Sequence, residues 1–235
     1  MAVNTIQVKK HAYKTIGGVS RLVQVVFIIS TIISFVAVIS GYLQSQLLNK
    51  ALNGEVISEA TATANDAREG VIGIIQSIVL ILGIIVFLVW VYRVSTNLHS
   101  LEKPRMKFTP GWAVGWFFVP FASLVQPYKA VAEIHKASNP KIDPNLLIVD
   151  DLKTPGIVKW WWAFFLISNF LANIAFKLVL QGETITDLLV STYAYMASDA
   201  IDIIGLIVTI VMVKQISQSQ EMRFQKFNQV SVITA

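Results

Sequence analysis

Two pairs of polar residues interrupt long apolar stretches, and their types and spacing are the best suited to chemistry in this chain. Asp199 and Asp202 are three residues apart, so a helix would place both carboxylates on one face. Asn169 and Asn173 are four residues apart and would share a face in the same way. Because both pairs reach a similar depth from the polar segment around Thr184, the four side chains are predicted to form one intramembrane polar cluster.

Three interpretations of this cluster remain open. In the first, it binds a cation or proton, or lines a path for a solute, because ionisable side chains inside membrane spans are costly and often mark such paths. In the second, the amides of Asn169 and Asn173 hold the carboxyl groups and join two helices, with a net gain of about 1 kcal/mol or less. In the third, Asp199 lies nearer the external water and caps a helix.

The remaining residue types argue against an enzyme. The chain has no cysteine, which excludes disulfides, thiolate metal sites and cysteine nucleophiles. Its three histidines, His11, His99 and His135, are far apart and lack metal-ligand spacing. Neither a Gly-x-Ser-x-Gly turn nor a phosphate-binding Gly-Lys-Ser/Thr loop is present. We therefore expect no catalytic residue, no metal site and no cofactor.

The elements that must position the polar pairs are membrane spans. Of the 235 residues, 54% are hydrophobic and only 14% are charged, whereas about a quarter of an average soluble domain is charged. Crossing the hydrocarbon core takes about 20 helical residues. Four stretches reach this length, namely residues Leu22–Leu43, Val71–Tyr92, Trp160–Leu180 and Leu188–Val213. The sequence thus predicts an all-α polytopic membrane helical bundle, in which residues 1–235 form a single integral membrane domain.

A fifth apolar segment, residues 109–125, is shorter and is punctuated by proline, glycine and tryptophan. The residues that define it and its exit are Pro110, Gly111, Trp112, Gly115, Trp116, Pro120 and Pro127. Thr109-Pro110 is typical of a helix start, whereas the two later prolines each remove a backbone donor. The segment is therefore predicted to be re-entrant, packed through its two glycines, or interfacial, anchored by its two tryptophans. A full fifth span is the remaining alternative.

The basic residues favour a segment that does not span. With four spans only, every basic cluster lies on one side of the membrane, and the acidic connections at residues 44–70 and around Glu183 lie on the other. The clusters contain Lys9, Lys10, Lys14, Arg21, Arg93, Lys103, Arg105, Lys107, Lys129, Lys136, Lys141, Lys153, Lys159, Lys214, Arg223 and Lys226. The positive-inside rule then places both termini in the cytoplasm. Because these residues flank apolar spans, the net charge of +5 indicates a membrane and no nucleic acid.

A cytoplasmic amphipathic helix is predicted over about residues 121–138. Beyond Pro120, apolar residues recur at helical spacing, while Lys129, Glu133 and Lys136 fall on other faces. We expect this helix to run along the cytoplasmic surface and to end near Asn139.

Several motifs resemble those of one bacterial family of multi-pass membrane proteins, the domain-of-unknown-function family 4328. The motif at the cytoplasmic end of the second span contains Trp90, Tyr92, Arg93 and Asn97. The strongest match is the run Phe-Thr-Pro-Gly-Trp-Ala-Val-Gly-Trp-Phe-Phe-Val-Pro that begins at Phe108. The resemblance continues through residues 127–138 and the Trp-rich start of the next span to residues 214–221. It implies an integral membrane protein of unassigned activity.

Two functions are compatible with these features. The first is a non-enzymatic membrane component that binds a protein or lipid partner through the fifth segment and the amphipathic helix. The second is a small solute or ion transporter or channel, in which the fifth segment and the polar cluster line a path. Four spans are few for one pore, so this function would require a homo-oligomer. In either case we expect the bacterial plasma (inner) membrane as the location.

Overall fold

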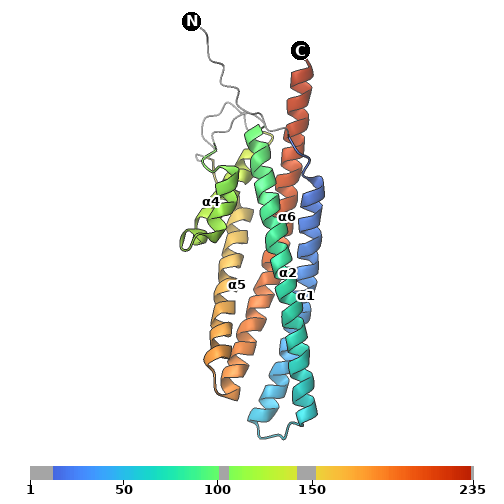
Figure 1. Ribbon diagram of the computed structural model, residues 1–235, viewed down its shortest axis with the longest axis vertical. Helices are drawn as coiled ribbons and strands as arrows, with labels where there is room; N and C mark the ends of the chain where they lie inside the picture. The colour runs from blue at the N-terminus through green and yellow to red at the C-terminus, as the bar shows by residue number, and fades with distance from the viewer. Residues whose placement is uncertain (1–12, 101–105, 142–151, 234–235) are drawn as a thin grey trace. The chain divides into compact units, whose positions relative to one another are not determined.

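The computed structural model describes residues 13–100, 106–141 and 152–233, and these ranges contain helices and no strand (Figure 1). Its α-helices are α1 (Gly17–Leu52), α2 (Glu59–Ser100), α3 (Pro110–Gly115), α4 (Gln126–Ala137), α5 (Gly156–Gln181) and α6 (Ile185–Ile233). Two short 3-10 helices, η1 (Trp116–Phe118) and η2 (Ala122–Leu124), lie between α3 and α4. The all-α prediction is confirmed. The basic residues Lys9, Lys10, Lys103 and Arg105, and His11, lie outside the described residues.

Four of these helices, α1, α2, α5 and α6, are long and apolar enough to cross a membrane. Only 11–22% of the residues in their most apolar windows are buried, so most of their apolar side chains face outward. A contiguous apolar exterior is typical of a surface covered by lipid. The prediction of four spans is confirmed, and residues 109–125 do not form a fifth helix of that length.

The helices extend beyond the predicted spans into polar sequence. Helix α2 begins at Glu59 and not near Val71, and α6 continues to Ile233, well past Val213. Ala, Glu, Gln, Lys and Arg in these extensions are good helix formers, so the helices continue where the apolar residues end. As a result the predicted connection at residues 44–70 is mostly helical.

The contacts of the chain divide it into two compact units. The span unit comprises Arg21–Phe87 and Gly156–Val213. The hairpin unit comprises Met1–Ser20, Leu88–Pro155 and Lys214–Ala235. The sequence predicts one domain, whereas the structure thus has two groups of internal contacts, to which α2 and α6 each contribute one end.

Close approaches between helices hold the span unit together. At Gly205 of α6, an added Cβ would lie 3.1 Å from the Cβ of Phe164 on α5. At Gly41 of α1, it would meet the side chain of Met196 on α6. Small residues at such crossings let helices pack tightly in lipid, where no hydrophobic force drives them together.

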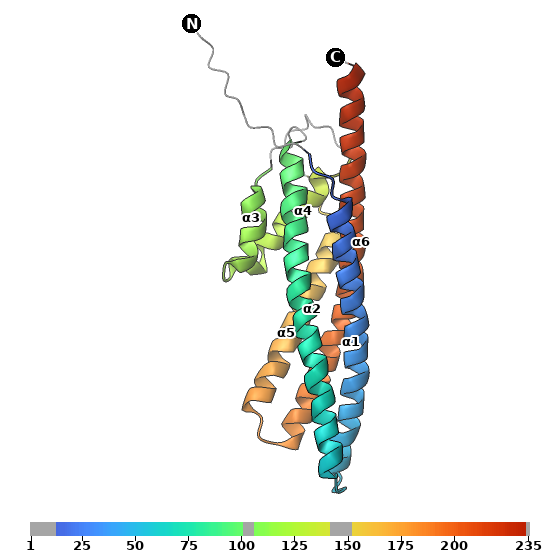
Figure 2. The same ribbon diagram turned by 45° about the vertical axis from the view of Figure 1, so that its right-hand side comes forward.

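The hairpin unit contains a helical hairpin, which we define as Pro110–Leu124 (α3, η1 and η2). The hairpin folds back onto α4, and α3 and α4 lie side by side (Figure 2). Helix α3 starts as predicted, because Thr109 is its N-cap and accepts a hydrogen bond from the backbone N–H of Trp112 at 3.4 Å. Pro110 occupies the first turn, where the missing donor costs nothing.

The amphipathic helix differs from the prediction at its start and in its environment. Helix α4 begins at Gln126 and not near residue 121, because Phe121 has a φ of 61° and a helix cannot pass through it. Pro127, which was predicted to interrupt a helix, lies in the first turn of α4 and starts it. Most of the apolar face of α4 is buried within the hairpin unit.

Candidate functional site

The hairpin exposes large apolar side chains at its turn. Phe121 is 88% exposed and Phe118 is 68% exposed, and Val125 beside them is also exposed. The positive φ of Phe121 is uncommon for a bulky residue and costs of order 1–3 kcal/mol, so it directs this ring at the expense of backbone strain. Exposed apolar groups at the end of a short turn form a surface that membrane or protein can cover.

Two lysines and two tryptophans line a cavity of about 270 Å³ beside α3 and α4. Its lining is Lys107, Phe108, Thr109, Trp112, Trp116, Gln126 and Lys129. The two indole rings pack with their centroids 4.8 Å apart. Gly115 leaves room for the ring of Trp112, while Gly111 faces open space among the described residues and makes no close helix contact. The predicted close approach of the two glycines to other helices is therefore not found among the described residues, because the ring beside Gly115 belongs to α3 itself.

Glu133 of α4 fixes the entry to the hairpin. Its side chain is 5% exposed, and its two carboxylate oxygens accept hydrogen bonds from the backbone N–H groups of Lys107 (2.5 Å) and Phe108 (3.1 Å). A carboxylate that accepts backbone N–H groups is strongly held. Glu133 was predicted to lie on a polar face, and the sequence offered no sign that it would be buried.

Trp90, Arg93 and Asn97 bind other segments of the hairpin unit. The indole N–H of Trp90, which is fully buried, donates to Ser217 Oγ on α6 at 3.0 Å. Asn97 both donates to the backbone oxygen of Lys14 (2.8 Å) and accepts from its N–H (3.0 Å). Arg93 donates to the backbone oxygen of Thr15 at 3.4 Å. These predicted site residues therefore hold the segment before α1 and the end of α6 against α2.

Two residues of α6 for which the sequence predicted no contact complete this arrangement. The buried amide of Gln220 donates to the backbone oxygen of Val94 on α2 (2.9 Å) and to Ser138 Oγ at the end of α4 (3.1 Å). Arg223 donates to the backbone oxygen of Ala137, and burial lowers the pKa of its guanidinium. We call Trp90, Asn97, Gln220 and Arg223 the polar clamp.

An aromatic stack joins the segment before α1 to α6. The rings of Tyr13 and Phe224 lie 3.9 Å apart and nearly parallel. The hydroxyl of Tyr13 donates to Glu221 Oε2 at 3.1 Å. Burial, together with the negative charge of Glu221, raises the pKa of Tyr13, as expected for a phenol that donates to a carboxylate.

The intramembrane polar residues of the span unit pair differently from the prediction. Asp199 on α6 accepts a hydrogen bond from the amide of Gln76 on α2 at 2.9 Å. Asp202 has a side-chain hydrogen bond with Ser168 on α5, and the hydroxyl of Ser198 donates to the backbone oxygen of Ser168 at 2.9 Å. Gln76 and Ser168 therefore take the places predicted for two asparagines.

The predicted asparagine partners turn to their own helix. The amide of Asn169 donates to the backbone oxygen of Phe165 at 2.7 Å, and that of Asn173 donates to the backbone oxygen of Asn169 at 2.8 Å. Both side chains are exposed. The structure thus brings Asp199 and Asp202 together on one helix but does not bring the asparagines to them.

A comparison with family models identifies the family of this chain. Residues 53–218 match the model of the domain of unknown function DUF4328, which is more than half of the chain. The chain belongs to this family. The match runs from just before α2 into α6, so it includes the hairpin, α4 and α5 but leaves α1 outside. No curated protein and no solved structure matches this DUF4328 chain.

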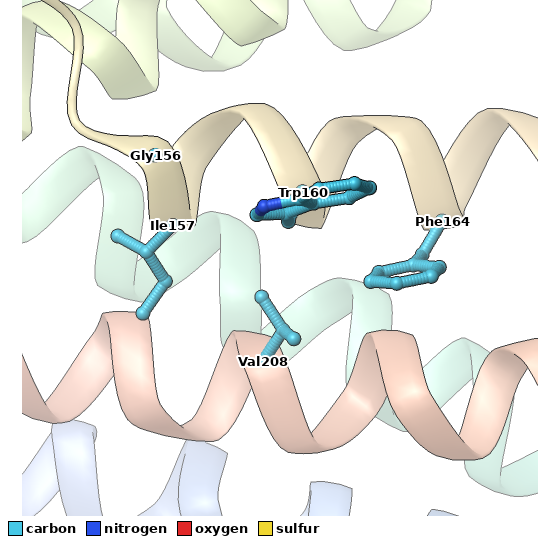
Figure 3. A pocket seen from close by; sticks show the side chains of 5 residues that line it. All are labelled: Gly156, Ile157, Trp160, Phe164 and Val208. Carbon is cyan, nitrogen blue, oxygen red and sulfur yellow. The ribbon is translucent and has the colours of Figure 1, made fainter.

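The span unit of this DUF4328 chain has an apolar groove along α5. Gly156, Ile157, Trp160 and Phe164 lie along one side of α5, and Val208 of α6 faces them (Figure 3). The groove has a volume of about 570 Å³ and an almost wholly apolar lining. Such a lining has no group that binds charge or performs chemistry, so the groove is a surface for apolar contact only.

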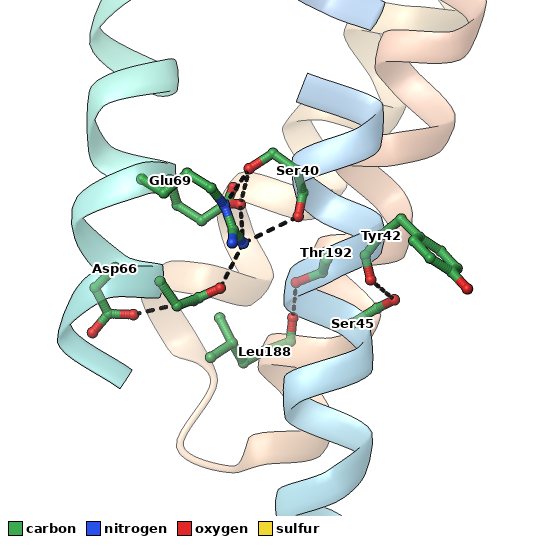
Figure 4. A network of polar contacts seen from close by, with 9 residues as sticks. Ser40, Tyr42, Ser45, Asp66, Glu69, Leu188 and Thr192 are labelled. Atoms are coloured by element: carbon green, nitrogen blue, oxygen red, sulfur yellow. Dashed lines mark hydrogen bonds and ion pairs between the residues drawn. The ribbon is translucent and has the colours of Figure 1, made fainter. Parts of the chain in front are cut away.

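A polar network joins α1 and α2 near the short connection of residues 53–58. Arg68 donates to Ser40 Oγ (2.8 Å) and to Asn65 Oδ1 (2.6 Å), and it forms an ion pair with Glu69 at 3.2 Å. Ser40 and Glu69 face one another between the two helices (Figure 4). The partners satisfy each other, as is typical of a structural network.

The start of α6 carries a reciprocal cap. Asp187 accepts hydrogen bonds from the N–H groups of Glu183 and Thr184, and the hydroxyl of Thr184 accepts one from the N–H of Asp187. The hydrogen bonds from Thr184 lower the pKa of the exposed Asp187 carboxyl. Among the described residues of this DUF4328 chain, no group of three or more His, Cys, Asp and Glu could hold a metal ion.

Proposed function

We propose that this chain is a non-enzymatic component of the bacterial plasma membrane that binds lipid at the cytoplasmic face through its hairpin, with both termini in the cytoplasm. The observation that carries the proposal is the exposed apolar turn of the hairpin, at Phe118 and Phe121. A bulky side chain that is 88% exposed in a strained backbone conformation needs an apolar medium to cover it. Lipid provides such a medium.

Tryptophan and lysine flank the turn in the order expected at a membrane surface. Trp112 and Trp116 lie on the hairpin, and Lys107 and Lys129 lie where the chain enters the hairpin and leaves it. Indole rings favour the headgroup level, and basic residues favour the cytoplasmic side. The same side chains would suit a soluble surface poorly, because they expose large apolar area to water.

The depth of the hairpin in a membrane tests this proposal. Because the native chain has no cysteine, Phe118→Cys and Phe121→Cys can each carry a single nitroxide label. In liposomes, we expect both labels to collide with oxygen more than with a water-soluble nickel chelate in electron paramagnetic resonance. Lys141→Cys, an exposed position of the same unit, is the matched control and should show the opposite preference. Labels at the hairpin that behave like the control would refute lipid binding by the hairpin.

Cysteine labelling also tests the orientation of the chain. Val56 is 97% exposed in the connection between α1 and α2, and Lys141 follows α4. A membrane-impermeant maleimide should modify Val56→Cys in intact spheroplasts and Lys141→Cys only after permeabilisation. The reverse pattern would place the termini outside.

A second function is favoured by one specific contact, the hydrogen bond between Gln76 and Asp199 inside the predicted spans. With the pair formed by Asp202 and Ser168, it brings polar groups of three helices, α2, α5 and α6, into hydrogen-bonded pairs. Such groups could bind a cation or proton in a transporter or channel that acts as a homo-oligomer. Cation flux into proteoliposomes that is the same with Asp199→Asn plus Asp202→Asn as with the native chain would exclude it.

A further inference from the structure

We propose that the cavity beside the hairpin binds the phosphate headgroup of an anionic phospholipid, such as phosphatidylglycerol. This inference rests on the proposed function, because a hairpin that enters the bilayer brings the cavity to the headgroup level. The ligand class follows from the lining, in which two ammonium groups, Lys107 and Lys129, flank two indole rings.

The two lysines are available to an anion. Neither ammonium forms an ion pair or a hydrogen bond with any residue that the structure describes, and both side chains are exposed. The nearest carboxylate on α4 is that of Glu133, which is buried and accepts the backbone N–H of Lys107. The structure therefore fixes the backbone at Lys107, whose side chain is exposed and lines the cavity.

Neutral donors in the lining supplement the charge. The oxygen of Thr109 already accepts a hydrogen bond from the N–H of Trp112, so its hydroxyl proton remains to be donated. The amide of Gln126, at the start of α4, supplies two further N–H donors. Phosphate oxygens accept several such hydrogen bonds at once. A phosphatidylcholine headgroup also carries a phosphate, but its choline cation is repelled by the two lysines, so this lipid should bind more weakly.

The size of the cavity matches a headgroup and not a whole lipid. Its volume of about 270 Å³ is below the range of about 300–1,000 Å³ that holds drug-sized ligands. The acyl chains would remain outside, where Phe118 and Phe121 are exposed. One phospholipid would thereby contact both the polar cavity and the apolar turn of the same hairpin.

Lipid titration of the full chain tests this inference. The protein in a neutral maltoside detergent is titrated with phosphatidylglycerol or with phosphatidylcholine of the same acyl chains, and native mass spectrometry counts the bound lipids. For Lys107→Gln plus Lys129→Gln, we expect about thirtyfold weaker binding of phosphatidylglycerol at low salt, since one basic group beside an anionic surface contributes on the order of a fivefold change. Binding of phosphatidylcholine should weaken by a much smaller factor.

The matched control removes the same charge elsewhere in the hairpin unit. Lys141 and Lys153 are exposed and do not line the cavity, so Lys141→Gln plus Lys153→Gln should leave the affinity for phosphatidylglycerol nearly unchanged. Lys107→Arg plus Lys129→Arg should retain binding, which shows that the loss is due to charge and not to misfolding. Inorganic phosphate added at millimolar concentration should not displace the lipid.

Three results would overturn the headgroup site. The first is that Lys107→Gln plus Lys129→Gln binds phosphatidylglycerol as tightly as the native chain. The second is that Lys141→Gln plus Lys153→Gln loses as much affinity for this lipid. The third is that inorganic phosphate displaces the lipid fully, which would make the site one for free phosphate. If they occur while the nitroxide at Phe118 still lies in lipid, the headgroup site is wrong and the proposed function stands. A nitroxide in water refutes the proposed function itself.

Discussion

The hairpin unit and the span unit hold their helices together in different ways. In the hairpin unit, buried polar side chains reach across helices, as Gln220 does from α6 to α2 and to the end of α4. In the span unit, the closest approaches are apolar, as where Gly205 faces Phe164. The span unit also has interhelical hydrogen bonds, one from Gln76 to Asp199 with partly buried partners and one from the buried Ser198 to the backbone oxygen of the buried Ser168.

This difference follows from the solvent around each unit. Around the predicted spans the surrounding lipid is as apolar as the side chains, so close packing at small residues contributes more than burial does. Where water borders the hairpin unit, away from the apolar turn of the hairpin, burial of apolar groups such as Trp90 and Ile134 stabilises the unit directly. Polar groups that become buried with them gain from partners, as the Gln220 amide nitrogen and Arg223 Nη1 do, whereas Gln220 Oε1 and Arg223 Nη2 have no hydrogen-bond partner among the described residues.

The largest effect is expected where the polar clamp is broken. Gln220→Ala removes two hydrogen bonds and leaves a cavity, so it should lower the free energy of unfolding by about 2–4 kcal/mol. Gln218→Ala, at an exposed position of the same helix, should change it by less than about 0.5 kcal/mol. Unfolding in mixed micelles with increasing dodecyl sulfate measures both. Equal stability of the two variants would show that the polar clamp contributes little.

Overpacking the span unit should have a somewhat smaller effect. Gly205→Leu places a Cβ 3.1 Å from that of Phe164 and adds further atoms, which should cost about 1–3 kcal/mol. Gly73→Leu is the matched control, since no described atom would lie within 4 Å of its Cβ, and it should be tolerated. The same unfolding titration compares them. If both glycines tolerate leucine, close packing is not what holds α5 to α6.

Release of the segment before α1 should be a local effect. Asn97→Ala removes both hydrogen bonds to Lys14, at a cost of about 1–2 kcal/mol, and should increase amide hydrogen exchange around Lys14 without unfolding the helices. Thr96→Ala, whose hydroxyl bonds only to its own helix at Tyr92, should leave exchange there unchanged. Unchanged exchange in Asn97→Ala would mean that Arg93 and Tyr13 suffice to hold this segment.

The smallest effect is a dependence of stability on pH, which is expected from a partly buried histidine of the hairpin unit. Burial lowers the pKa of His135 below its ordinary 6.5, although a hydrogen bond with Gln215 opposes the shift. The unfolded chain then binds this proton more readily than the folded chain, so stability falls as pH drops below 6.5, by at most about 1.4 kcal/mol per pH unit. This loss ends once the pH is below the folded-state pKa.

Melting temperatures at about pH 7.5 and about pH 5.5 measure the contribution of this histidine. In His135→Gln the difference between the two values should be smaller than in the native chain. His99→Gln, at an exposed histidine of α2, should keep the native difference. An unaltered difference in His135→Gln would mean that the imidazole is equally free to protonate in both states.

The sequence predicted the four spans and the start of α3 because both depend on neighbouring residues. An apolar run longer than about 20 residues must satisfy its backbone internally, and Thr109-Pro110 caps a helix wherever it lies. The sequence also indicated Trp90, Arg93 and Asn97 as site residues, although through a family resemblance and not through their contacts. The start of α4 was missed because nothing local shows that Phe121 adopts a positive φ.

The partners of buried polar groups depended on the tertiary structure alone. Helices α2 and α5 are apolar on most sides, so hydropathy does not show which face of each turns toward α6. The sequence therefore did not reveal that Asp199 pairs with Gln76, or that Asn169 bonds to the backbone of its own helix. Composition thus determined that the chain has four helices long and apolar enough to cross a membrane. Only packing decided which distant side chains meet, because a hydrogen bond requires two atoms to lie within about 3 Å, a distance set by the rotation and offset of whole helices.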